Sequence, residues 1–570
     1  MNHRLIALGC VAAALAAGNS PAAMYYVSQS AGNDTNSGTS WRSAKKTIQE
    51  AVNRAVDGDT VVVTSGVYSA GGKVTPGEFS MNRVCIENNI TVSSLYGKVW
   101  TTIVGRGPAG EGAVRCAYVG CGLLAGFTLS NGYTQAEGNI ELNSCGGGVL
   151  GNAGADWWNT EGTVSNCLII RCSAMPRGYG GGAYGASLVG CTLWSNQGLR
   201  ASGAYRSILK DCTLVYNVTT SSVDCTGGAG FSLLENCIVT ANYASAVGGA
   251  DWATLSNCVL MANRATNSAF SVGGARASRL YGCTVVSNYG ATSGGASGGV
   301  LVDCLLWGNW CMWYGGGAGG GAVLTNCTVR NNRSQTDGGG LMDATAYNCS
   351  IVSNTALASG GGVCASEQGA ATLYNCLVTR NFAFYGGGVH RTIMYNSTVA
   401  DNTSSQPSGG TCGDGNGRSY AYNSIVYFNT CLSTPAASNY YVWFDPISGS
   451  FQPDTHFISS DTAPLATNEG SSFVMNADPQ FVARVSNDFH LPPSSPCVNQ
   501  GMLSYVYTDT DLDGNPRVVD GVVDLGCYEY SPTSKYALAL GPEGAVPEPA
   551  AAAAALLFCI AAARLRARRA

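Results

Sequence analysis

The chain has 570 residues, of which 76 are glycine and 24 are cysteine, while Asp, Glu, Lys and Arg together make up only 11%. Glycine destabilises a helix interior by about 1 kcal/mol relative to alanine, so this composition excludes a mainly helical protein and favours strands and turns. The formal net charge of −5 excludes nucleic acid as a partner on electrostatic grounds.

Residues 1–23 are predicted to be a secretory signal peptide. A short basic start precedes an apolar stretch from Leu5 to Ala17, and small residues follow at Ala22 and Ala23, which is the order typical of such leaders. The apolar stretch is too short to span a bilayer. The chain is therefore expected to be exported.

Residues 24–57 are predicted to form an N-terminal cap. Ile48, Val52 and Val56 recur at helical spacing, which indicates a short amphipathic helix from Thr47 to Ala55. This helix is expected to cover the open end of a core, and Thr60–Thr64 is expected to be the first strand behind it. A cap of this kind also protects an exposed sheet edge.

Residues 58–430 contain a repeat that averages about 23 residues. Its most regular position is occupied by Cys167, Cys191, Cys212, Cys237, Cys258, Cys283, Cys304, Cys327, Cys349 and Cys376, and then by Ser397 and Ser424. Self-similarity at such a period is the signature of a solenoid. The repeat is rich in β-formers and has no room for two amphipathic helices, which excludes ankyrin and tetratricopeptide arrays.

Each repeat carries an aliphatic residue two positions after the cysteine, an asparagine five positions after it, and in most repeats a glycine cluster further on. Side chains alternate along a strand, so the cysteine and the aliphatic residue are both expected to face inward. Asparagine tolerates the left-handed conformation and is expected at a tight bend, where stacked copies would form a ladder of amide hydrogen bonds. The glycines are expected at a second corner with positive φ.

These features predict an all-β fold, a right-handed parallel β-helix with three short strands and three corners per coil. The repeat resembles the pectate-lyase-like β-helix superfamily, and its glycine pairs resemble the repeats of polymorphic outer-membrane proteins. The ten repeated cysteines are expected to be a stack of reduced, buried thiols, because parallel strands lie about 4.8 Å apart and a disulfide needs Cβ atoms about 3.5–4.5 Å apart. Better candidates for disulfides are Cys412 with Cys431 and Cys497 with Cys527.

Residues 431–531 are predicted to be a C-terminal cap. Asp478-Pro479, Phe489-His490-Leu491, Asp513-Gly514 and Asp524-Leu525-Gly526 resemble the choice-of-anchor Q segment of bacterial surface proteins. Within it, Asp509, Asp511, Asp513 and Asp520 match positions of a calcium-binding loop, with Gly514 at the sharp turn. Two interpretations stay open, a calcium site and aspartates that cap a surface turn. Calcium is the only cofactor that the sequence suggests.

Residues 532–570 are predicted to be a linker and a sorting signal. Val546-Pro547-Glu548-Pro549 precedes an apolar run from Ala550 to Ala563 and a basic tail. This order resembles the PEP-CTERM signal, which implies recognition by a membrane protease of the exosortase type, anchoring in the membrane before processing, and a basic tail in the cytoplasm. The protein is therefore expected at the cell surface or outside the cell.

The functional prediction is a structural, adhesive or carbohydrate-binding protein of the cell envelope, with no catalytic residues assigned. Trp194, Trp307, Trp313 and Tyr314 are the aromatic candidates for contact with a sugar. The alternative is a polysaccharide lyase or glycoside hydrolase acting on an acidic glycan. The nearest cluster of suitable groups is Arg380 with Asp401 near His390, which a surface ion pair explains more simply.

Overall fold

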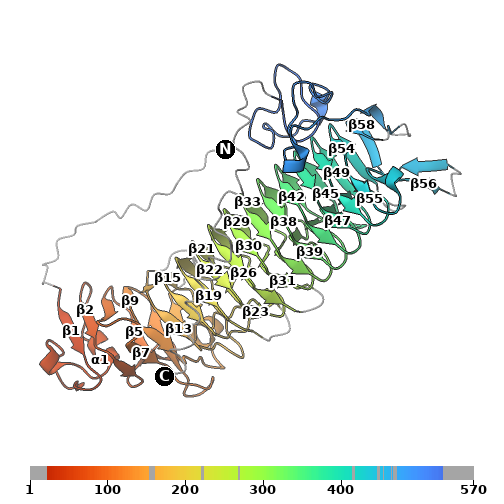
Figure 1. Cartoon of the computed structure of the whole chain (residues 1–570). Helices are drawn as coiled ribbons and strands as arrows, with labels where there is room; N and C mark the ends of the chain where they lie inside the picture. The colour runs from red at the N-terminus through yellow and green to blue at the C-terminus, as the bar shows by residue number, and fades with distance from the viewer. Residues whose placement is uncertain are drawn as a thin grey trace.

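The structure is a computed structural model that describes residues 22–152, 161–219, 224–266, 270–413, 418–445, 450–453, 455–463, 465–466 and 471–530. The chain folds into an all-β parallel solenoid of about 12 turns with roughly 25 residues per turn, wound in the right-handed sense (Figure 1). The prediction of a right-handed parallel β-helix is confirmed. The sorting segment 532–570 and most of the predicted leader lie outside the described residues.

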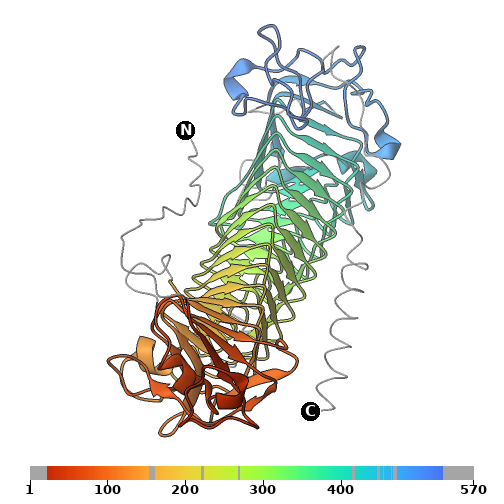
Figure 2. The ribbon, with the colours of Figure 1, turned by 90° about the vertical axis from the view of Figure 1, so that its left-hand side faces the viewer.

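The coils stack along one long axis, with the N-terminal coils at one end and the C-terminal segment at the other (Figure 2). A central coil contains four short strands, β24 (Ala250–Asp251), β25 (Thr254–Ser256), β26 (Val259–Met261) and β27 (Arg264–Ala265). Each strand pairs in parallel with its counterpart one coil later. The prediction of three strands per coil is therefore wrong, because the segments before and after each cysteine are separate strands and a further short strand follows the asparagine.

Strands from successive coils form four rows. The first row lies in a 15-stranded sheet that we call sheet B: β4 (Lys73–Val74), β5 (Met81–Ile86), β8 (Val114–Val119), β11 (Val149–Gly151), β14 (Ala183–Tyr184), β17 (Ala204–Tyr205), β20 (Ala229–Gly230), β24, β28 (Ala275–Arg276), β32 (Ala296–Ser297), β36 (Ala318–Gly319), β40 (Leu341–Met342), β44 (Val363–Cys364), β48 (Val389–His390) and β52 (Thr411–Cys412). The row that follows the asparagine contains β23 (Tyr243–Ala244), β27, β31 (Tyr289–Gly290), β35 (Trp310–Cys311), β39 (Arg333–Ser334), β43 (Thr355–Ala356), β47 (Phe382–Ala383), β51 (Thr403–Ser404) and β55 (Thr430–Cys431).

The two remaining rows flank the cysteine and belong to one 33-stranded sheet, sheet A. Before the cysteine lie β12 (Thr163–Ser165), β15 (Ser187–Val189), β18 (Ile208–Lys210), β21 (Leu233–Glu235), β25, β29 (Arg279–Tyr281), β33 (Val300–Val302), β37 (Val323–Thr325), β41 (Thr345–Tyr347), β45 (Ala371–Tyr374), β49 (Thr392–Tyr395) and β53 (Ser419–Tyr422). After it lie β13 (Leu168–Ile170), β16 (Thr192–Trp194), β19 (Thr213–Val215), β22 (Ile238–Thr240), β26, β30 (Thr284–Val286), β34 (Leu305–Trp307), β38 (Thr328–Arg330), β42 (Ser350–Val352), β46 (Leu377–Thr379), β50 (Thr398–Ala400) and β54 (Ile425–Tyr427).

The N-terminal end of sheet A is formed by β1 (Met24–Val27), β2 (Thr60–Val63), β3 (Gly66–Tyr68), β6 (Thr91–Ser94), β7 (Thr101–Val104), β9 (Leu123–Ala125) and β10 (Thr128–Ser130). The helix α1 (Ile48–Val52) covers this end, as predicted, and buries Ile48 and Val52. It is shorter than the predicted Thr47–Ala55, and Val56 lies beyond it and is 64% exposed. The Gln49 amide accepts a hydrogen bond from the backbone N–H of Cys85 and donates one to its carbonyl. The helix thus satisfies backbone groups at the edge of the solenoid.

The corners of the coil depend on residues with positive φ. These are the residues directly before the repeated cysteine, such as Asn257 (φ 53°), and those directly before the repeated asparagine, such as Ala262 (φ 52°). The expectation that the asparagine itself is left-handed is therefore wrong. The predicted positive φ holds for the first glycine of several clusters, including Gly338 (φ 64°) and Gly360 (φ 63°).

The repeated asparagines form a continuous buried ladder. Its members are Asn196, Asn217, Asn242, Asn263, Asn288, Asn309, Asn332, Asn354, Asn381, Asn402 and Asn429. The Asn288 Oδ1 accepts from the backbone N–H and the side-chain amide of Asn263 at 2.9 and 3.0 Å. The Asn288 amide then donates to the Leu260 carbonyl and to Asn309 Oδ1. Each side chain thus satisfies its hydrogen-bonding groups with neighbouring coils, and the predicted ladder is confirmed.

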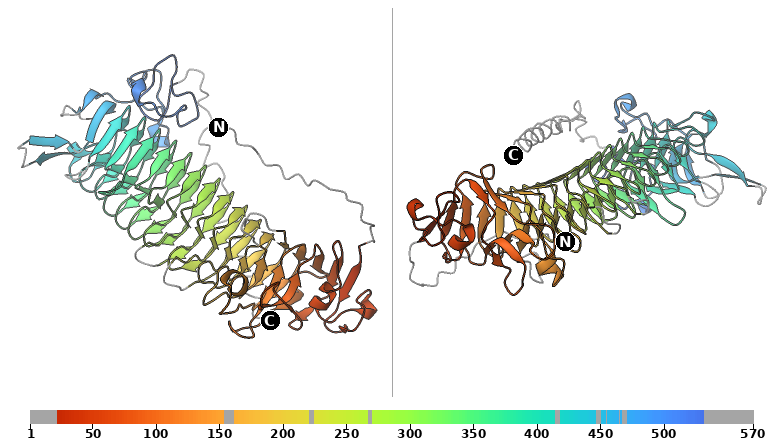
Figure 3. Two further views of the ribbon diagram at one scale, coloured as in Figure 1. Left: turned by 180° about the vertical axis from the view of Figure 1, so that it is seen from behind. Right: turned by 90° about the horizontal axis from the view of Figure 1, so that it is seen from below.

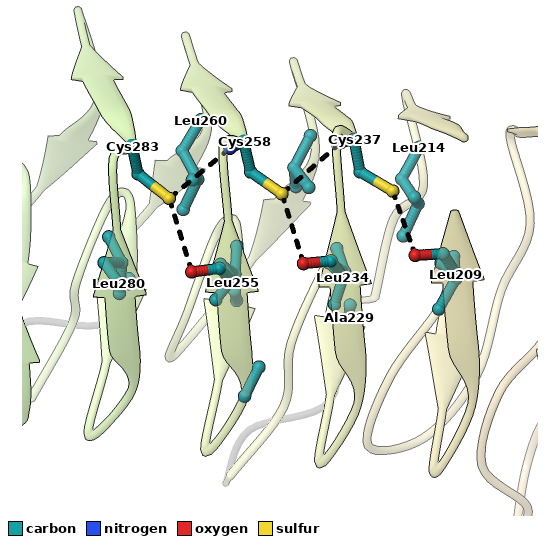
Figure 4. Close-up of a cluster of buried hydrophobic side chains, with 14 of the residues drawn as sticks. Leu209, Leu214, Ala229, Leu234, Cys237, Leu255, Cys258, Leu260, Leu280 and Cys283 are labelled. Carbon is teal, nitrogen blue, oxygen red and sulfur yellow. Dashed lines mark hydrogen bonds between the residues drawn. The ribbon is translucent and has the colours of Figure 1, made fainter. Parts of the chain in front are cut away.

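The repeated cysteines form a second ladder, which Figure 4 shows for Cys237, Cys258 and Cys283. The Cys258 Sγ accepts a hydrogen bond from the backbone N–H of Cys237 at 3.3 Å and lies 3.5 Å from the Leu234 carbonyl, to which it can donate. None of the cysteines in the described residues forms a disulfide, as predicted for the ladder. Ser397 occupies the same position, and its hydroxyl accepts a hydrogen bond from the backbone N–H of Cys376. Serine can therefore replace cysteine there, because it accepts the same backbone hydrogen bond.

The predicted disulfides at Cys412–Cys431 and Cys497–Cys527 are wrong, since none of these four cysteines forms a disulfide. Cys497 packs beside Ile425 and Leu491, whereas Cys527 packs beside Leu377 and Ala400. The two cysteines of the second pair therefore lie in different apolar clusters.

The end of the chain continues sheet A and then folds back. β58 (Thr455–Thr462) pairs with β53 and β59 (Ser472–Met475) with β58, and the hairpin β56 (Val442–Asp445) with β57 (Ser450–Pro453) extends from this end (Figure 3). Residues 478–530, which we call the C-terminal segment, run back along the last coils. Asn396 and Asn423 donate side-chain hydrogen bonds to the Tyr505 and Met502 carbonyls. The remaining helical turns are single short ones: Trp41–Ser43, Ile140–Ser144, Pro435–Ala437, Arg484–Ser486 and Leu503–Tyr505.

Candidate functional site

One row of side chains on sheet B changes its chemistry from coil to coil. The first residue of each short strand from β14 to β48, such as Ala250 or Ala275, belongs to the hydrophobic core, so the second residue points away from the core. We call these second residues the outer row: Tyr184, Tyr205, Gly230, Asp251, Arg276, Ser297, Gly319, Met342, Cys364, His390 and Cys412. Unlike the ladders, this row holds aromatic, charged, small and sulfur-containing residues in turn.

A small hollow with a volume of about 100 Å³ opens over the outer row between Tyr205 and Arg276. Its floor carries Asp251 and Arg276, which lie side by side because β24 and β28 are in register. The Arg276 guanidinium donates two hydrogen bonds to the Asp251 carboxylate, at 2.9 and 2.8 Å. Asp224 lies 3.5 Å from the same guanidinium. The hydrogen bond to Asp251 raises the pKa of Arg276 above its ordinary value, so the site holds a fixed positive group between two carboxylates.

Aromatic rings line one side of this hollow. The rings of Tyr205 and Phe231 lie 5.4 Å apart, and those of Phe231 and Trp252 stack at 6.1 Å with an interplanar angle of 10°. Gly230 makes room for this row, because a Cβ there would approach the Tyr205 ring within 3.0 Å. Trp252 is 59% exposed, so it presents a ring face to solvent. Arg200 lies at the rim of the hollow.

An aromatic face next to paired charged groups has a defined chemical capacity. Ring faces pack against the apolar C–H faces of flat ligands, and the neighbouring carboxylates and guanidinium accept and donate directional hydrogen bonds. The arrangement suits a ligand with an apolar face and many hydroxyl groups.

The groups that the sequence singled out do not meet at one place. Asp401 pairs with Arg484 at 2.5 Å, and Arg380 donates to the Val485 carbonyl. His390 lies on sheet B beside Cys364. The predicted ion pair between Arg380 and Asp401 is therefore wrong, because the C-terminal segment supplies the partner of each.

The four aromatic candidates are also dispersed. Trp194 and Trp307 lie on sheet A, where the Arg330 guanidinium stacks 5.2 Å from the Trp307 ring. Trp313 and Tyr314 are 42% and 45% exposed and lie in the turn that follows β35. None of the four lines the hollow over sheet B.

The four aspartates of the predicted calcium loop have different surroundings. Asp511 is buried and accepts the backbone N–H groups of Asp513, Asn515 and Glu529. Asp513 contacts His490 at 2.6 Å, and the Asp509 carbonyl accepts from Arg517 N–H. Asp509 and Asp520 are exposed. Within the described ranges, no three side chains of the His, Cys, Asp or Glu type lie close enough together to share a metal ion.

The hollow was not predicted from the sequence, because its residues differ in every coil. A signal nevertheless exists, since each outer-row residue follows a Gly-Gly-Ala phrase or a close variant, as in Gly-Gly-Ala-Asp251 and Gly-Gly-Ala-Arg276. The repeated phrase fixes the backbone, so the variable residue after it is the one that is free to carry function.

With this geometry, the chain is a parallel β-solenoid with a charged and aromatic site on one face. No family model and no curated protein sequence match it. The crystal structure of pectate lyase Pel9A is 14% identical, with a TM-score of 0.21, and the match covers 90% of this chain and 98% of that one. The complex of XylC with xylose is 10% identical, with a TM-score of 0.27 and coverage of 89% and 98%. The catalytic domain of a GH87 alpha-1,3-glucanase in complex with tetrasaccharides is 10% identical, with a TM-score of 0.29 and coverage of 67% and 66%. At these scores the similarities carry no argument about function.

No helix in the ranges that the structure describes is both long and apolar enough to cross a membrane. The predicted apolar run Ala550–Ala563 lies outside those ranges.

Proposed function

We propose that this chain is an exported carbohydrate-binding β-solenoid whose glycan site is the hollow over sheet B. The single observation that carries the proposal is the juxtaposition of the exposed Trp252 ring with the Asp251–Arg276 pair on adjacent coils. Export and surface sorting are supported by the leader-like residues 1–23 and the PEP-CTERM-like residues 532–570.

The ring and the charged pair would have separate tasks in binding. Trp252 offers a flat apolar surface to one face of a sugar ring, which gives affinity by excluding water. Asp251 is held by Arg276, so its free lone pairs point in fixed directions and select hydroxyl positions. Asp224 is 69% exposed at its side chain and supplies an acceptor at the rim.

A glycan array followed by calorimetry on residues 24–530 tests the proposal. The Trp252→Ala variant is expected to lower affinity for the best glycan by about 5- to 30-fold, since loss of a stacking aromatic face removes about 1–2 kcal/mol. Trp310→Ala is the matched control, because Trp310 is 37% exposed on another face of the coil. Equal affinity in wild type and Trp252→Ala would refute the assignment of the site.

The second candidate function is cleavage of an acidic glycan, because Asp224 and Asp251 place two carboxylates at one hollow. Formation of unsaturated products, or release of reducing ends, from a panel of acidic glycans would support it. Activity that is retained in both Asp251→Asn and Asp224→Asn would show that these carboxylates are not its catalytic groups.

A further inference from the structure

Near its C-terminal end the outer row consists of four residues that are ligands for soft metal ions. Met342, Cys364, His390 and Cys412 occupy equivalent positions on four consecutive strands of sheet B. Cys364 pairs in register with Met342 on one side and with His390 on the other, and His390 pairs with Cys412. The chain has only 4 histidines and 10 methionines, so their presence together in one row with two cysteines is a distinctive pattern.

These four side chains are shielded from solvent but lie outside the main hydrophobic core. Their exposed fractions are 4% for Met342, 2% for Cys364, 7% for His390 and 5% for Cys412. The preceding strand residues Leu341, Val363 and Val389 belong to the core. Glycine corners pack against the row, since a Cβ at Gly338 or Gly360 would meet the Cβ of Met342 or Cys364 at 2.9 or 2.7 Å.

The distance between the two strongest donors fits a shared metal ion. The Cys364 Sγ lies 3.6 Å from His390 Nδ1. With metal–sulfur and metal–nitrogen bonds of about 2.3 and 2.0 Å, this separation corresponds to a sulfur–metal–nitrogen angle of about 114°. An angle of this size belongs to three- or four-coordinate geometry, so a third donor is required. Met342, one coil away on the other side of Cys364, offers its thioether.

The donor set selects the kind of ion. Thiolate and thioether sulfur favour copper(I), whereas calcium and magnesium need oxygen ligands. A set of three His, Cys, Asp or Glu side chains, as zinc sites use, does not occur among the described residues. A monovalent cation also balances the charge of one thiolate, so the complex is neutral and suits a buried position.

We propose that Met342, Cys364 and His390 form a copper(I) site in the outer row. Binding replaces the Cys364 S–H bond with a sulfur–copper bond and releases the proton to the buffer, and the oxidation state of copper does not change. His390 binds through Nδ1, and Met342 completes the coordination as a neutral donor. The site is independent of the proposed glycan-binding hollow, which lies several coils away along the same sheet.

The rival location for copper(I) is inside the core. The sulfurs of Cys116 and Cys172 lie 3.9 Å apart, and the cysteine ladder supplies further thiols. These alternatives contain sulfur only, whereas the proposed site contains one imidazole. The coordination shell therefore distinguishes them.

The test is an anaerobic copper(I) titration of the reduced chain, residues 24–530, against a chromophoric copper(I) chelator. We expect wild type to bind one equivalent with an affinity at least about tenfold higher than that of Cys364→Ser or His390→Ala, the size of loss typical when a metal site is impaired. X-ray absorption of the bound copper is expected to show one nitrogen among sulfur neighbours. Below the pKa of the free thiol, affinity should rise about tenfold per pH unit, because one proton is released.

Two control variants make the result decisive. Cys258→Ser removes one thiol of the ladder, and Cys116→Ser removes one thiol of the Cys116–Cys172 pair. Both variants are expected to leave copper(I) binding unchanged. A sulfur-only shell, or unchanged affinity in both Cys364→Ser and His390→Ala, would overturn the proposal. Circular dichroism of each variant checks that the solenoid is intact.

Discussion

The solenoid coils and the C-terminal segment are held together by opposite means. The coils rely on uncharged groups that repeat, above all the asparagine ladder and the thiol ladder. The C-terminal segment, residues 478–530, adds contacts between ionisable side chains that each occur once: Arg517 with Glu529 at 3.3 Å, Arg484 with Asp401, and His490 with Asp488 and Asp513. Losing one ladder residue affects only the coils next to it, and the other copies of the contact remain, whereas each of these contacts in the segment has no second copy.

The segment also packs against side chains of the coils that would otherwise be exposed to solvent. Tyr347, Tyr374, Tyr395 and Tyr422 stack along sheet A with ring centroids 4.7–5.1 Å apart. Tyr507 packs edge-on against Tyr374 and Tyr395. The outward side chains of sheet A are therefore tyrosines where the segment covers it. This indicates that the segment packs specifically against these coils.

The largest expected effect comes from the buried ion pair of the segment. Arg517 is 0% and Glu529 2% exposed at their side chains, and burial lowers the pKa of Arg517 below its ordinary value. Arg517→Met leaves the buried Glu529 carboxyl and the Asp524 and Gly526 carbonyls without their donor and should destabilise the docked segment by about 3–5 kcal/mol. Hydrogen exchange of residues 478–530 measures this loss. Unchanged exchange there would show that the pair does not hold the segment.

A smaller loss is expected from breaking the asparagine ladder. Asn288→Ala removes the acceptor of Asn263 N–H and the donor to the Leu260 carbonyl, both buried, and should lower the free energy of unfolding by about 2–4 kcal/mol. Urea denaturation followed by circular dichroism is the measurement. Thr284→Ala, on an outward position of β30, is the control and should change it by less than about 0.5 kcal/mol.

Raising the pH should loosen the segment and leave the ladders unchanged. Burial raises the pKa of Glu529 to about 8 from 4.5. For His490, burial alone lowers the pKa, but hydrogen bonds to Asp513 and Asp488 outweigh it and raise the pKa to about 9 from 6.5. Both folded-state values exceed the ordinary ones, so the stabilisation is complete below the ordinary pKa and is lost as pH rises through about 8 and then 9.

Hydrogen exchange at pH 6 and pH 9.5, corrected for the intrinsic chemical rate, tests this sign. Protection should fall in residues 478–530 and stay constant in the coils around Asn263. His490→Gln should abolish the upper part of the change. A segment that gains protection at high pH would contradict the prediction.

The smallest expected effect comes from the thiol ladder, where each side chain both accepts and donates a hydrogen bond. Cys258→Ala removes the acceptor of Cys237 N–H and should cost about 1–2 kcal/mol. Cys258→Ser should cost less, because its hydroxyl can accept and donate as Ser397 does. If both substitutions cost the same in urea denaturation, apolar packing of sulfur is what the ladder provides.

The regular part of the fold could be predicted because it repeats. Cysteine, aliphatic residue and asparagine recur at fixed offsets, so their inward position and the ladders follow from strand periodicity. The fourth strand and the left-handed corners could not be predicted, since the residues before the ladder asparagines include Ser195, Tyr216 and Ala262 and share no chemistry.

The candidate site was missed for the same reason. The residues of the hollow do not recur from repeat to repeat, and only the register of β24 with β28 brings Asp251 and Arg276 together. The partners of Arg380 and Asp401 could not be predicted from spacing either, because Val485 and Arg484 lie far along the sequence and reach them only when the C-terminal segment folds back.

The in-register stacking of sheet B turns sequence distance into physical length. Neighbouring strands lie about 4.8 Å apart, and five strand steps lead from Asp251 through Arg276, Ser297, Gly319 and Met342 to Cys364. The two proposed sites are therefore separated by about 24 Å along the axis. Deleting one whole coil between the two sites would shorten their separation by one strand spacing of about 4.8 Å and leave both sites intact. The number of coils therefore sets the distance between the two sites.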